Sequence, residues 1–309
     1  MSPPTETKTT FTLQVSLYVC RMTIHEASQQ LIFQLFHLYD EREAKNIADW
    51  VMENITGWKK IDRVSNKSVP LSATQQTQLQ QYTNELLTHT PVQYVLHEAW
   101  FYKMKLYVDE NVLIPRPETE ELVEWIINEV KSKNSKVKTV LDIGTGSGCI
   151  PLALKKNRPS YEIHSCDISE AALTVARRNA AGQQLAIHFH RCNILSETER
   201  ESLPQFDTIV SNPPYIPQKD KASMAQNVLN HEPHIALFVP DDNPLIFYSA
   251  IADFASTHLK KDGTIYLEIH EDLGLAVINL FKEKGYRQIE LKKDLQGKDR
   301  MVRITNVEM

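Results

Sequence analysis

The chain has 309 residues, of which 42% are hydrophobic, and its 34 basic and 39 acidic residues give a formal net charge of −5. This length favours two domains over one and leaves room for a large core. The acidic balance argues against a nucleic-acid-binding protein that relies on bulk electrostatic attraction, and no apolar run approaches the roughly 18 residues that a membrane span needs.

The amino terminus and the cysteines bear on the compartment. Residues 1–21 are polar and threonine-rich and lack the apolar segment of a secretory signal peptide, so we expect a disordered extension or the product of an upstream start site. No Cys-x-x-Cys pair is present, and no metal-binding cluster is evident. Free thiols of this kind are typical of a reducing compartment, so we expect a cytoplasmic protein. The cysteines are Cys20, Cys149, Cys166 and Cys192.

The region after this extension is expected to be helical. Apolar residues recur at helical spacing, and two capping-box patterns, Thr23 with Glu26 and Ser72 with Gln75, mark helix starts. We therefore expect an N-terminal helical domain at residues 22–91. From the pattern alone, this domain could recognise a substrate, mediate dimerisation or close over an active site.

The rest of the chain is expected to form an α/β domain. Residues 92–112 alternate like a β-hairpin, and a hairpin linker is expected at residues 92–115. Beyond it, short apolar strands alternate with helical stretches, which predicts a mostly parallel, doubly wound sheet. The last two strands are expected to form a hairpin, with one antiparallel strand. The expected strands are residues 137–143, 161–166, 186–191, 206–211, 263–269, 286–291 and 301–304.

The first of these strands runs into a glycine-rich loop, Gly144-Thr145-Gly146-Ser147-Gly148. Glycine allows a ligand to approach the backbone closely. A dinucleotide site would need glycine at position 149, where this chain has Cys149, and no P-loop lysine is present. Asp167 ends the next strand, where it can accept both hydroxyls of a ribose or cap the following helix. These features favour a nucleoside ligand without pyrophosphate.

A second motif, Asn212-Pro213-Pro214-Tyr215, follows the expected strand 206–211. Two prolines cannot continue a central strand because neither has an N–H to donate. The chain therefore forms a hook at a strand's carboxyl end, where open α/β sheets bind ligands. The side-chain oxygen of Asn212 and the carbonyl of Pro213 can each accept an N–H of a planar NH₂ group, and Tyr215 is expected to lie against that group. The alternative is a simple proline turn.

Together, the two motifs indicate an S-adenosylmethionine-dependent methyltransferase that acts on an NH₂ nitrogen. Over residues 22–304 the chain resembles the HemK/PrmC family of release factor glutamine methyltransferases. The resemblance also rests on the run at residues 112–120, Glu232-Pro233, Leu267-Glu268-Ile269 and the run at residues 293–300. The two longer runs are much more specific to this family than Asn-Pro-Pro-Tyr, which adenine-N6 methyltransferases share.

The resemblance implies a class I methyltransferase fold, with a Rossmann-like catalytic domain at residues 116–309 and a mostly parallel seven-stranded sheet. It implies methylation of the N5 side-chain nitrogen of the glutamine in the Gly-Gly-Gln motif of class I peptide chain release factors, which the helical domain would contact. S-adenosyl-L-methionine would be the cofactor and S-adenosyl-L-homocysteine the product. We expect a monomer with no bound metal and no direct contact with nucleic acid or membrane.

The expected site combines both motifs with residues that the resemblance adds. Asn193 and Ile194 would flank the adenine, although relatives usually have an acidic and then an aromatic residue there. Leu113, Arg116 and Glu118 would approach the cleft, although Glu118 could instead belong to an acidic first turn that the helix dipole favours. The expected cofactor-binding residues are Gly144, Thr145, Gly146, Ser147, Gly148, Asp167, Asn193, Ile194 and Asn212. The expected catalytic and substrate-binding residues are Asn212, Pro213, Pro214 and Tyr215, with Leu113, Arg116 and Glu118 on the substrate side.

Two other functions are compatible with the motifs. An adenine-N6 methyltransferase of DNA or RNA would flip a base into the same hook, but the net charge and the lack of a basic, aromatic-rich region argue against it. A non-catalytic adaptor that binds S-adenosylmethionine is the other possibility. The intact glycines, Asp167 and Asn212 argue against that adaptor.

Overall fold

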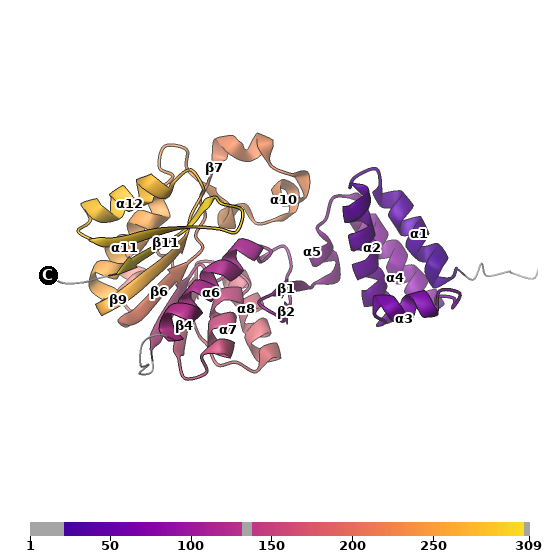
Figure 1. Cartoon of the computed structure of the whole chain (residues 1–309), viewed down its shortest axis with the longest axis horizontal. Coiled ribbons are helices and arrows are strands. Elements are labelled where there is room, and N and C mark those ends of the chain that lie inside the picture. The colour runs from indigo at the N-terminus through magenta and orange to yellow at the C-terminus, as the bar shows by residue number, and fades with distance from the viewer. Residues whose placement is uncertain (1–21, 132–137, 306–309) are drawn as a thin grey trace, which may run out of the picture. The chain divides into compact units, whose positions relative to one another are not determined.

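The computed structural model describes residues 22–131 and 138–305 (Figure 1). The expectations for residues 1–21, including Cys20, and for Val137 fall outside the described residues. The chain divides into two compact units, Met1–Leu87 and Thr88–Met309. In the described parts of the chain, no helix combines the length and the apolar character needed to cross a membrane.

The described part of the first unit contains the helices α1 (Ile24–Leu35), α2 (Glu41–Thr56), α3 (Lys60–Ser65) and α4 (Ala73–Leu87). Both capping boxes are confirmed. The Glu26 N–H donates to Thr23 Oγ1, and the Thr23 N–H donates back to Glu26 Oε2 at 2.8 Å. Ser72 and Gln75 make the same reciprocal pair at the start of α4. Helices α1, α2 and α4 bury their apolar faces against one another, which accounts for the helical periodicity.

The second unit begins with α5 (Val92–Leu96) and the hairpin of β1 (Ala99–Phe101) and β2 (Met104–Leu106). The prediction of a hairpin from residue 92 onward is therefore wrong for residues 92–96. Three successive side chains, Tyr94, Val95 and Leu96, are buried there, whereas successive side chains of a strand point to opposite faces. The two-residue turn at Tyr102 and Lys103 has positive φ at both positions, as in a type I′ turn.

The main sheet has seven strands in the order β10-β11-β9-β6-β3-β4-β5. Strands β3, β4, β5, β6 and β9 are parallel, and β11 runs antiparallel to both of its neighbours. The predicted parallel sheet and its final hairpin are thus confirmed. The strands are β3 (Thr139–Ile143), β4 (Glu162–Asp167), β5 (His188–Arg191), β6 (Phe206–Ser211), β9 (Leu259–Glu268), β10 (Gln288–Lys293) and β11 (Asp299–Thr305).

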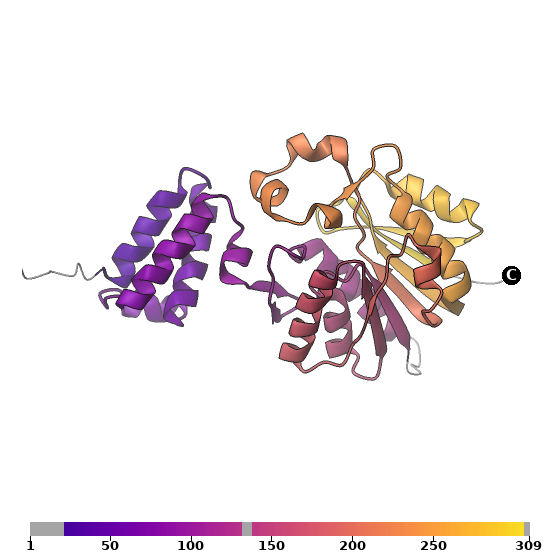
Figure 2. The same cartoon turned by 180° about the vertical axis from the view of Figure 1, so that it is seen from behind.

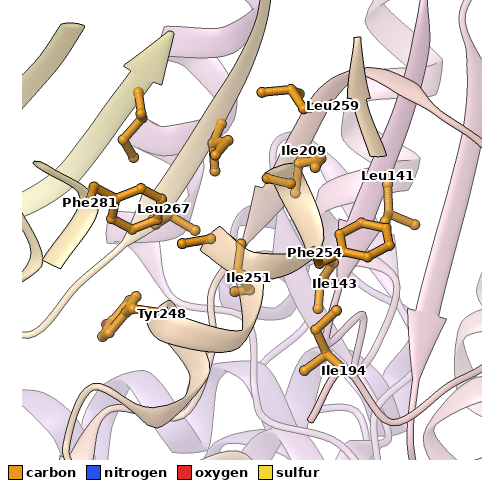
Figure 3. Close-up of a cluster of buried hydrophobic side chains, with 14 of the residues drawn as sticks. Leu141, Ile143, Ile194, Ile209, Tyr248, Ile251, Phe254, Leu259, Leu267 and Phe281 are labelled. Carbon is orange, nitrogen blue, oxygen red and sulfur yellow. The ribbon is translucent and has the colours of Figure 1, made fainter. Parts of the chain in front are cut away.

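Helices cover both faces of this sheet, as a doubly wound fold requires (Figures 1 and 2). Helices α11 (Ile246–His258) and α12 (Gly274–Glu283) cover one face. Figure 3 shows this apolar cluster, in which Tyr248, Ile251 and Phe254 pack with strand residues that include Ile209 and Leu267. The other face is covered by α6 (Pro117–Lys131), α7 (Cys149–Asn157), α8 (Glu170–Gln183) and the β1–β2 hairpin.

An excursion between β6 and α11 lies at the carboxyl end of the sheet, and the sequence pattern does not predict it. It contains β7 (Ile216–Pro217), the 3₁₀ helix η1 (Gln218–Ser223), α10 (Gln226–His231), η2 (His234–Ala236) and β8 (Phe238–Val239). Strands β7 and β8 pair in parallel, so the excursion leaves the hook and returns beside it.

Strand register brings both motifs to one place. Ile143 at the end of β3 pairs with Ser211 of β6 on one side and with Cys166 of β4 on the other. The next residue along the chain from each of these three is Gly144, Asn212 or Asp167, and Asp167 is the last residue of β4. They therefore meet at the same edge of the sheet, where a doubly wound fold binds ligands.

Candidate active site

A cavity of about 250 Å³ lies at this edge. Most of its walls are apolar, and its polar groups come from the ends of the central strands. Segments that lie far apart in sequence all contribute to it. The lining residues include Leu113, Gly144, Gly146, Asp167, Ile168, Asn193, Ile194, Asn212, Pro213, Pro214, Pro233, Ile235 and Phe247.

The three glycines of the loop have different surroundings. Gly146 has φ of +51°, and a Cβ on it would meet no heavy atom within 4 Å. Gly148 has φ of +81°, and a Cβ on it would lie 3.2 Å from Cβ of Ala176 in α8. Gly144 and Gly146 line the cavity, whereas the expected cofactor-binding residues Thr145, Ser147 and Gly148 are not among its lining residues. The open space beside Gly146 is where a ligand can approach the backbone.

Asp167 lies beside the glycine-rich loop. Its Oδ2 accepts the Gly146 N–H at 3.0 Å, and its Oδ1 accepts the Ser169 N–H at 2.9 Å. Burial raises the pKa of this carboxyl group. The prediction that Asp167 could itself cap the next helix is wrong, because the N-cap of α8 is Ser169, whose Oγ accepts the Ala172 N–H.

Asn193 and Ile194 follow β5 and line the cavity. The Asn193 Oδ1 accepts the Leu195 N–H at 3.0 Å, and its backbone N–H donates to Glu199. Its side-chain oxygen is thus engaged in shaping the turn. Ile194 is buried and presents an apolar surface to the cavity.

A hydrogen bond to Thr119, which itself donates to Glu268, orients the Asn212 amide. The Thr119 hydroxyl donates its proton to Glu268 Oε2 at 2.7 Å, so its oxygen can only accept from Asn212. The Asn212 Nδ2 donates to that oxygen at 3.1 Å. The amide orientation follows from this pairing, which leaves Asn212 Oδ1 as the group available to a ligand.

Tyr215 lies elsewhere than expected. It is not among the residues that line the cavity, and its hydroxyl donates to Glu268 Oε1 at 3.2 Å. Glu268 is 1% exposed, and burial raises its pKa to about 7. The carboxyl group of Glu268 thus accepts from Thr119 on one oxygen and from Tyr215 on the other, behind the hook rather than in the cavity.

The residues before α6 and in its first turn have separate roles. Leu113 lines the cavity. Arg116 pairs with the buried carboxylate of Glu232 at 2.6 Å, and the Ile114 N–H donates to the same carboxylate at 3.3 Å. Glu118 is half-buried and does not line the cavity. This segment therefore fastens the excursion after β7 to the start of α6.

The run at residues 293–300 supports the same region. It forms the turn between β10 and β11, where Asp294 accepts the backbone N–H groups of Gln296 and Lys298 at 2.9 Å. Arg300 donates to Asp294 Oδ2 at 3.2 Å and to the Ile269 carbonyl at 3.3 Å. Through Arg300, the run thus contacts Ile269, the residue that follows Glu268 at the end of β9.

Sequence reasoning assigned no role to Thr119, Glu232 or Glu268, although each lies within a segment that carried the resemblance. For Glu268 a signal was available. A carboxylate inside the apolar run Ile265-Tyr266-Leu267-Glu268-Ile269 is expected to be buried and therefore to need partners.

Comparisons with known proteins agree with this architecture. The family model described as "PrmC N-terminal domain" matches residues 26–96, and "Methyltransferase small domain" matches residues 122–235. A Flavobacterium psychrophilum protein named release factor glutamine methyltransferase is 40% identical over 285 residues, which cover 92% of this chain and 99% of that protein. A Streptococcus pneumoniae protein of the same name is 47% identical over 219 residues, covering 71% and 76%.

A solved structure described as "delta-N METTL16 MTase domain" has a TM-score of 0.50 and 13% identity, and the match covers 67% of this chain and 90% of that one. This likeness concerns the fold alone. The predicted class I methyltransferase fold is confirmed by the domain match and by the mostly parallel seven-stranded sheet. The identity to the Flavobacterium protein over nearly its whole length shows that this chain belongs to the release factor glutamine methyltransferase family.

Proposed function

We propose that this protein transfers the methyl group of S-adenosyl-L-methionine to the side-chain amide nitrogen, N5, of the glutamine in the Gly-Gly-Gln motif of class I release factors. The observation that carries this proposal is the Asn212 amide. Thr119 holds its nitrogen, so its oxygen is available beside the cavity. The enzyme would act as a monomer, and a release factor substrate would place its work in the cytoplasm.

The cavity suits the cofactor in shape and chemistry. Open space beside Gly144 and Gly146 admits a ligand against the backbone. Each carboxylate oxygen of Asp167 accepts one backbone N–H and keeps capacity for another donor, as two ribose hydroxyls require. The apolar side chains of Ile168 and Ile194 suit an adenine face. S-adenosylmethionine, when bound, supplies an electrophilic methyl group on a sulfonium with a neutral leaving group.

The hook is placed to activate the nucleophile, which is the difficult part of this reaction because an amide nitrogen is a poor nucleophile. The lone pair of a carboxamide nitrogen is delocalised into its carbonyl. Asn212 Oδ1 and the Pro213 carbonyl would each accept one N–H of the substrate amide, orienting the nitrogen and stabilising positive charge as it develops. Alignment of the two reacting atoms supplies a further part of the acceleration. The reaction demands no general base, because the proton can leave after methyl transfer.

The test is methylation with methyl-labelled S-adenosylmethionine in parallel reactions. One reaction contains a class I release factor, a second contains the same factor with the Gly-Gly-Gln glutamine replaced by asparagine, and a third contains DNA or RNA. We expect label in the first reaction alone. Label in nucleic acid would favour the adenine-N6 alternative, and no transfer to the release factor would overturn the proposal.

A further inference from the structure

Three histidines and one glutamate gather on one face of the sheet where β4 meets the edge strand β5. Glu162 and His164 lie two residues apart on β4, and His188 and His190 lie two residues apart on β5. Side chains two residues apart on a strand share a face. The strand register pairs His164 directly with His188. None of the four lines the cavity described above.

The distances among these side chains match those around a metal ion. One ligand atom each from Glu162, His164 and His188 lies within 4.8 Å of the other two. His164 Nε2 lies 3.2 Å from Glu162 Oε1. Two ligands bonded at about 2.0–2.1 Å to a tetrahedral zinc ion lie roughly 3.3 Å apart, so this pair already has the required spacing.

The third ligand can reach the same point with little movement. The His188 ring stacks on the His164 ring, with centroids 4.7 Å apart and planes at 28°. His188 and Glu162 are both exposed, whereas His164 is buried. Rotation of the exposed His188 ring can therefore bring its nitrogen into the coordination sphere without disturbing the core.

His190 occupies the position of a supporting residue. Its Nε2 lies 2.9 Å from His164 Nδ1, and the planes of the two rings are nearly parallel, at 3°. With the His164 proton on Nδ1 and donated to His190, the lone pair of His164 Nε2 faces Glu162 and is available to a metal.

We propose that Glu162, His164 and His188 bind one divalent transition-metal ion, with zinc as the best match and water completing a tetrahedral site. Two imidazoles and one carboxylate are ligands that zinc accepts readily. The ion would fasten the edge strand β5 to β4. This site lies outside the methyltransferase reaction, and it departs from the expectation that the protein binds no metal.

The test uses the full-length protein stripped of metal with a chelator and then titrated with zinc against a chromophoric competitor. We expect one zinc ion per chain. His188→Ala and Glu162→Gln should each remove or greatly weaken binding, and both positions are exposed, so the fold should persist. His25→Ala, at an exposed histidine on α1, is the matched control and should bind zinc like the wild type.

His190→Phe keeps an aromatic ring but removes the acceptor for His164, and it should weaken zinc binding about 10–100-fold, as loss of such supporting contacts does. Cobalt should give the absorption spectrum of a tetrahedral site in the wild type and not in His188→Ala. Wild type without zinc affinity, or His188→Ala with the wild-type affinity, would overturn the proposal and leave the imidazoles as a stacked edge cluster.

Discussion

At the scale of single residues, the central feature is the chain of hydrogen bonds from Asn212 through Thr119 to Glu268 and on to Tyr215. Three of its members lie outside the cavity lining. They act on a substrate only by fixing the Asn212 amide. The network therefore predicts different outcomes for Asn212, Thr119 and Glu268.

Asn212→Ala should lower methyl transfer by about 10²–10³-fold, the effect of removing one preorganised polar group that stabilises developing charge. Its affinity for S-adenosylmethionine should change little, because the amide oxygen matters most when charge builds on the attacking nitrogen. Single-turnover methylation of a release factor, with cofactor affinity measured by calorimetry, separates the two effects. A wild-type rate in this variant would mean that the hook is only structural.

Thr119→Val should lower the methylation rate although Thr119 does not line the cavity. The valine removes the acceptor that holds Asn212 and the donor to Glu268 Oε2. A buried oxygen that loses its hydrogen-bond partner costs about 1–3 kcal/mol of stability. Thr119→Ser keeps the hydroxyl and should restore the rate. If Thr119→Ser is as slow as Thr119→Val while both are folded, packing of the methyl group and not the hydrogen bond is what matters.

The pKa of Glu268 predicts a dependence of stability on pH. Burial raises that pKa from 4.5 to about 7, so between these values the folded protein holds a proton that the unfolded chain has lost. This group therefore stabilises the fold fully below pH 4.5, and the contribution disappears as pH rises through 7. Glu268→Gln removes this titration.

We expect the free energy of unfolding of Glu268→Gln to rise relative to wild type by roughly 3 kcal/mol between pH 4.5 and 8, from the linkage of about 1.4 kcal/mol per pKa unit. Urea unfolding across this range measures the difference. Asp142, whose pKa burial also raises to about 7, is present in both proteins, so its effect cancels. A constant difference at all pH values would contradict the raised pKa of Glu268.

At the scale of elements, two glycines in the loop between β3 and α7 have different roles, one in ligand binding and the other in stability. Gly146→Ala puts a Cβ into the open space of the cavity, whereas Gly148→Ala puts it against Ala176. Both have positive φ, which costs a residue with a Cβ about 1–2 kcal/mol. The backbone strain is similar in the two variants. Any difference between them in stability or cofactor affinity therefore comes from what the added Cβ contacts.

Gly146→Ala should weaken S-adenosylmethionine and S-adenosylhomocysteine alike, by at least about tenfold, or roughly 1.4 kcal/mol. Gly148→Ala should lose more stability, because α8 must shift to admit the methyl group. Thermal unfolding and calorimetry on both variants give the comparison. Unchanged cofactor affinity in a folded Gly146→Ala would show that the ligand does not approach this loop.

At the scale of the whole molecule, we propose that the helical domain at residues 22–91 recognises the release factor. Several large apolar side chains are exposed on its helices, including Phe33 at 69% and Ile61 at 71%. Exposed aromatic residues are common anchors of protein interfaces. The domain would then determine which protein is methylated, while the cavity determines the chemistry.

Phe33→Ser should raise KM for an intact release factor about fivefold, which corresponds to roughly 1 kcal/mol of interface energy. It should leave kcat and the methylation of a short Gly-Gly-Gln peptide unchanged. Leu275→Ser, at an apolar side chain in α12 that is 73% exposed, is the matched control and should behave like wild type. An unchanged KM would remove Phe33 from the recognition surface.

The sequence by itself determined the fold class, the strand that ends in the glycine-rich loop, the strand that ends in Asp167 and the hook at Asn212. These features depend on neighbouring residues, because hydrophobic periodicity, glycine and proline act on the local backbone. The same reasoning placed Gly144, Asp167 and Asn212 at strand ends, and a parallel sheet brings such ends together.

Only the tertiary structure decided what these residues contact. Asn212 meets Thr119 across 93 positions, and Arg116 meets Glu232 across 116. Tyr215 points to Glu268 instead of the cavity, and His164 meets His188 through strand register. Such pairs depend on the order of the strands in the sheet and on which residues stand opposite each other. Local sequence patterns determine neither of these. The sequence therefore specified where along the chain the site residues lie, and the packing of distant segments specified which partners orient their side chains.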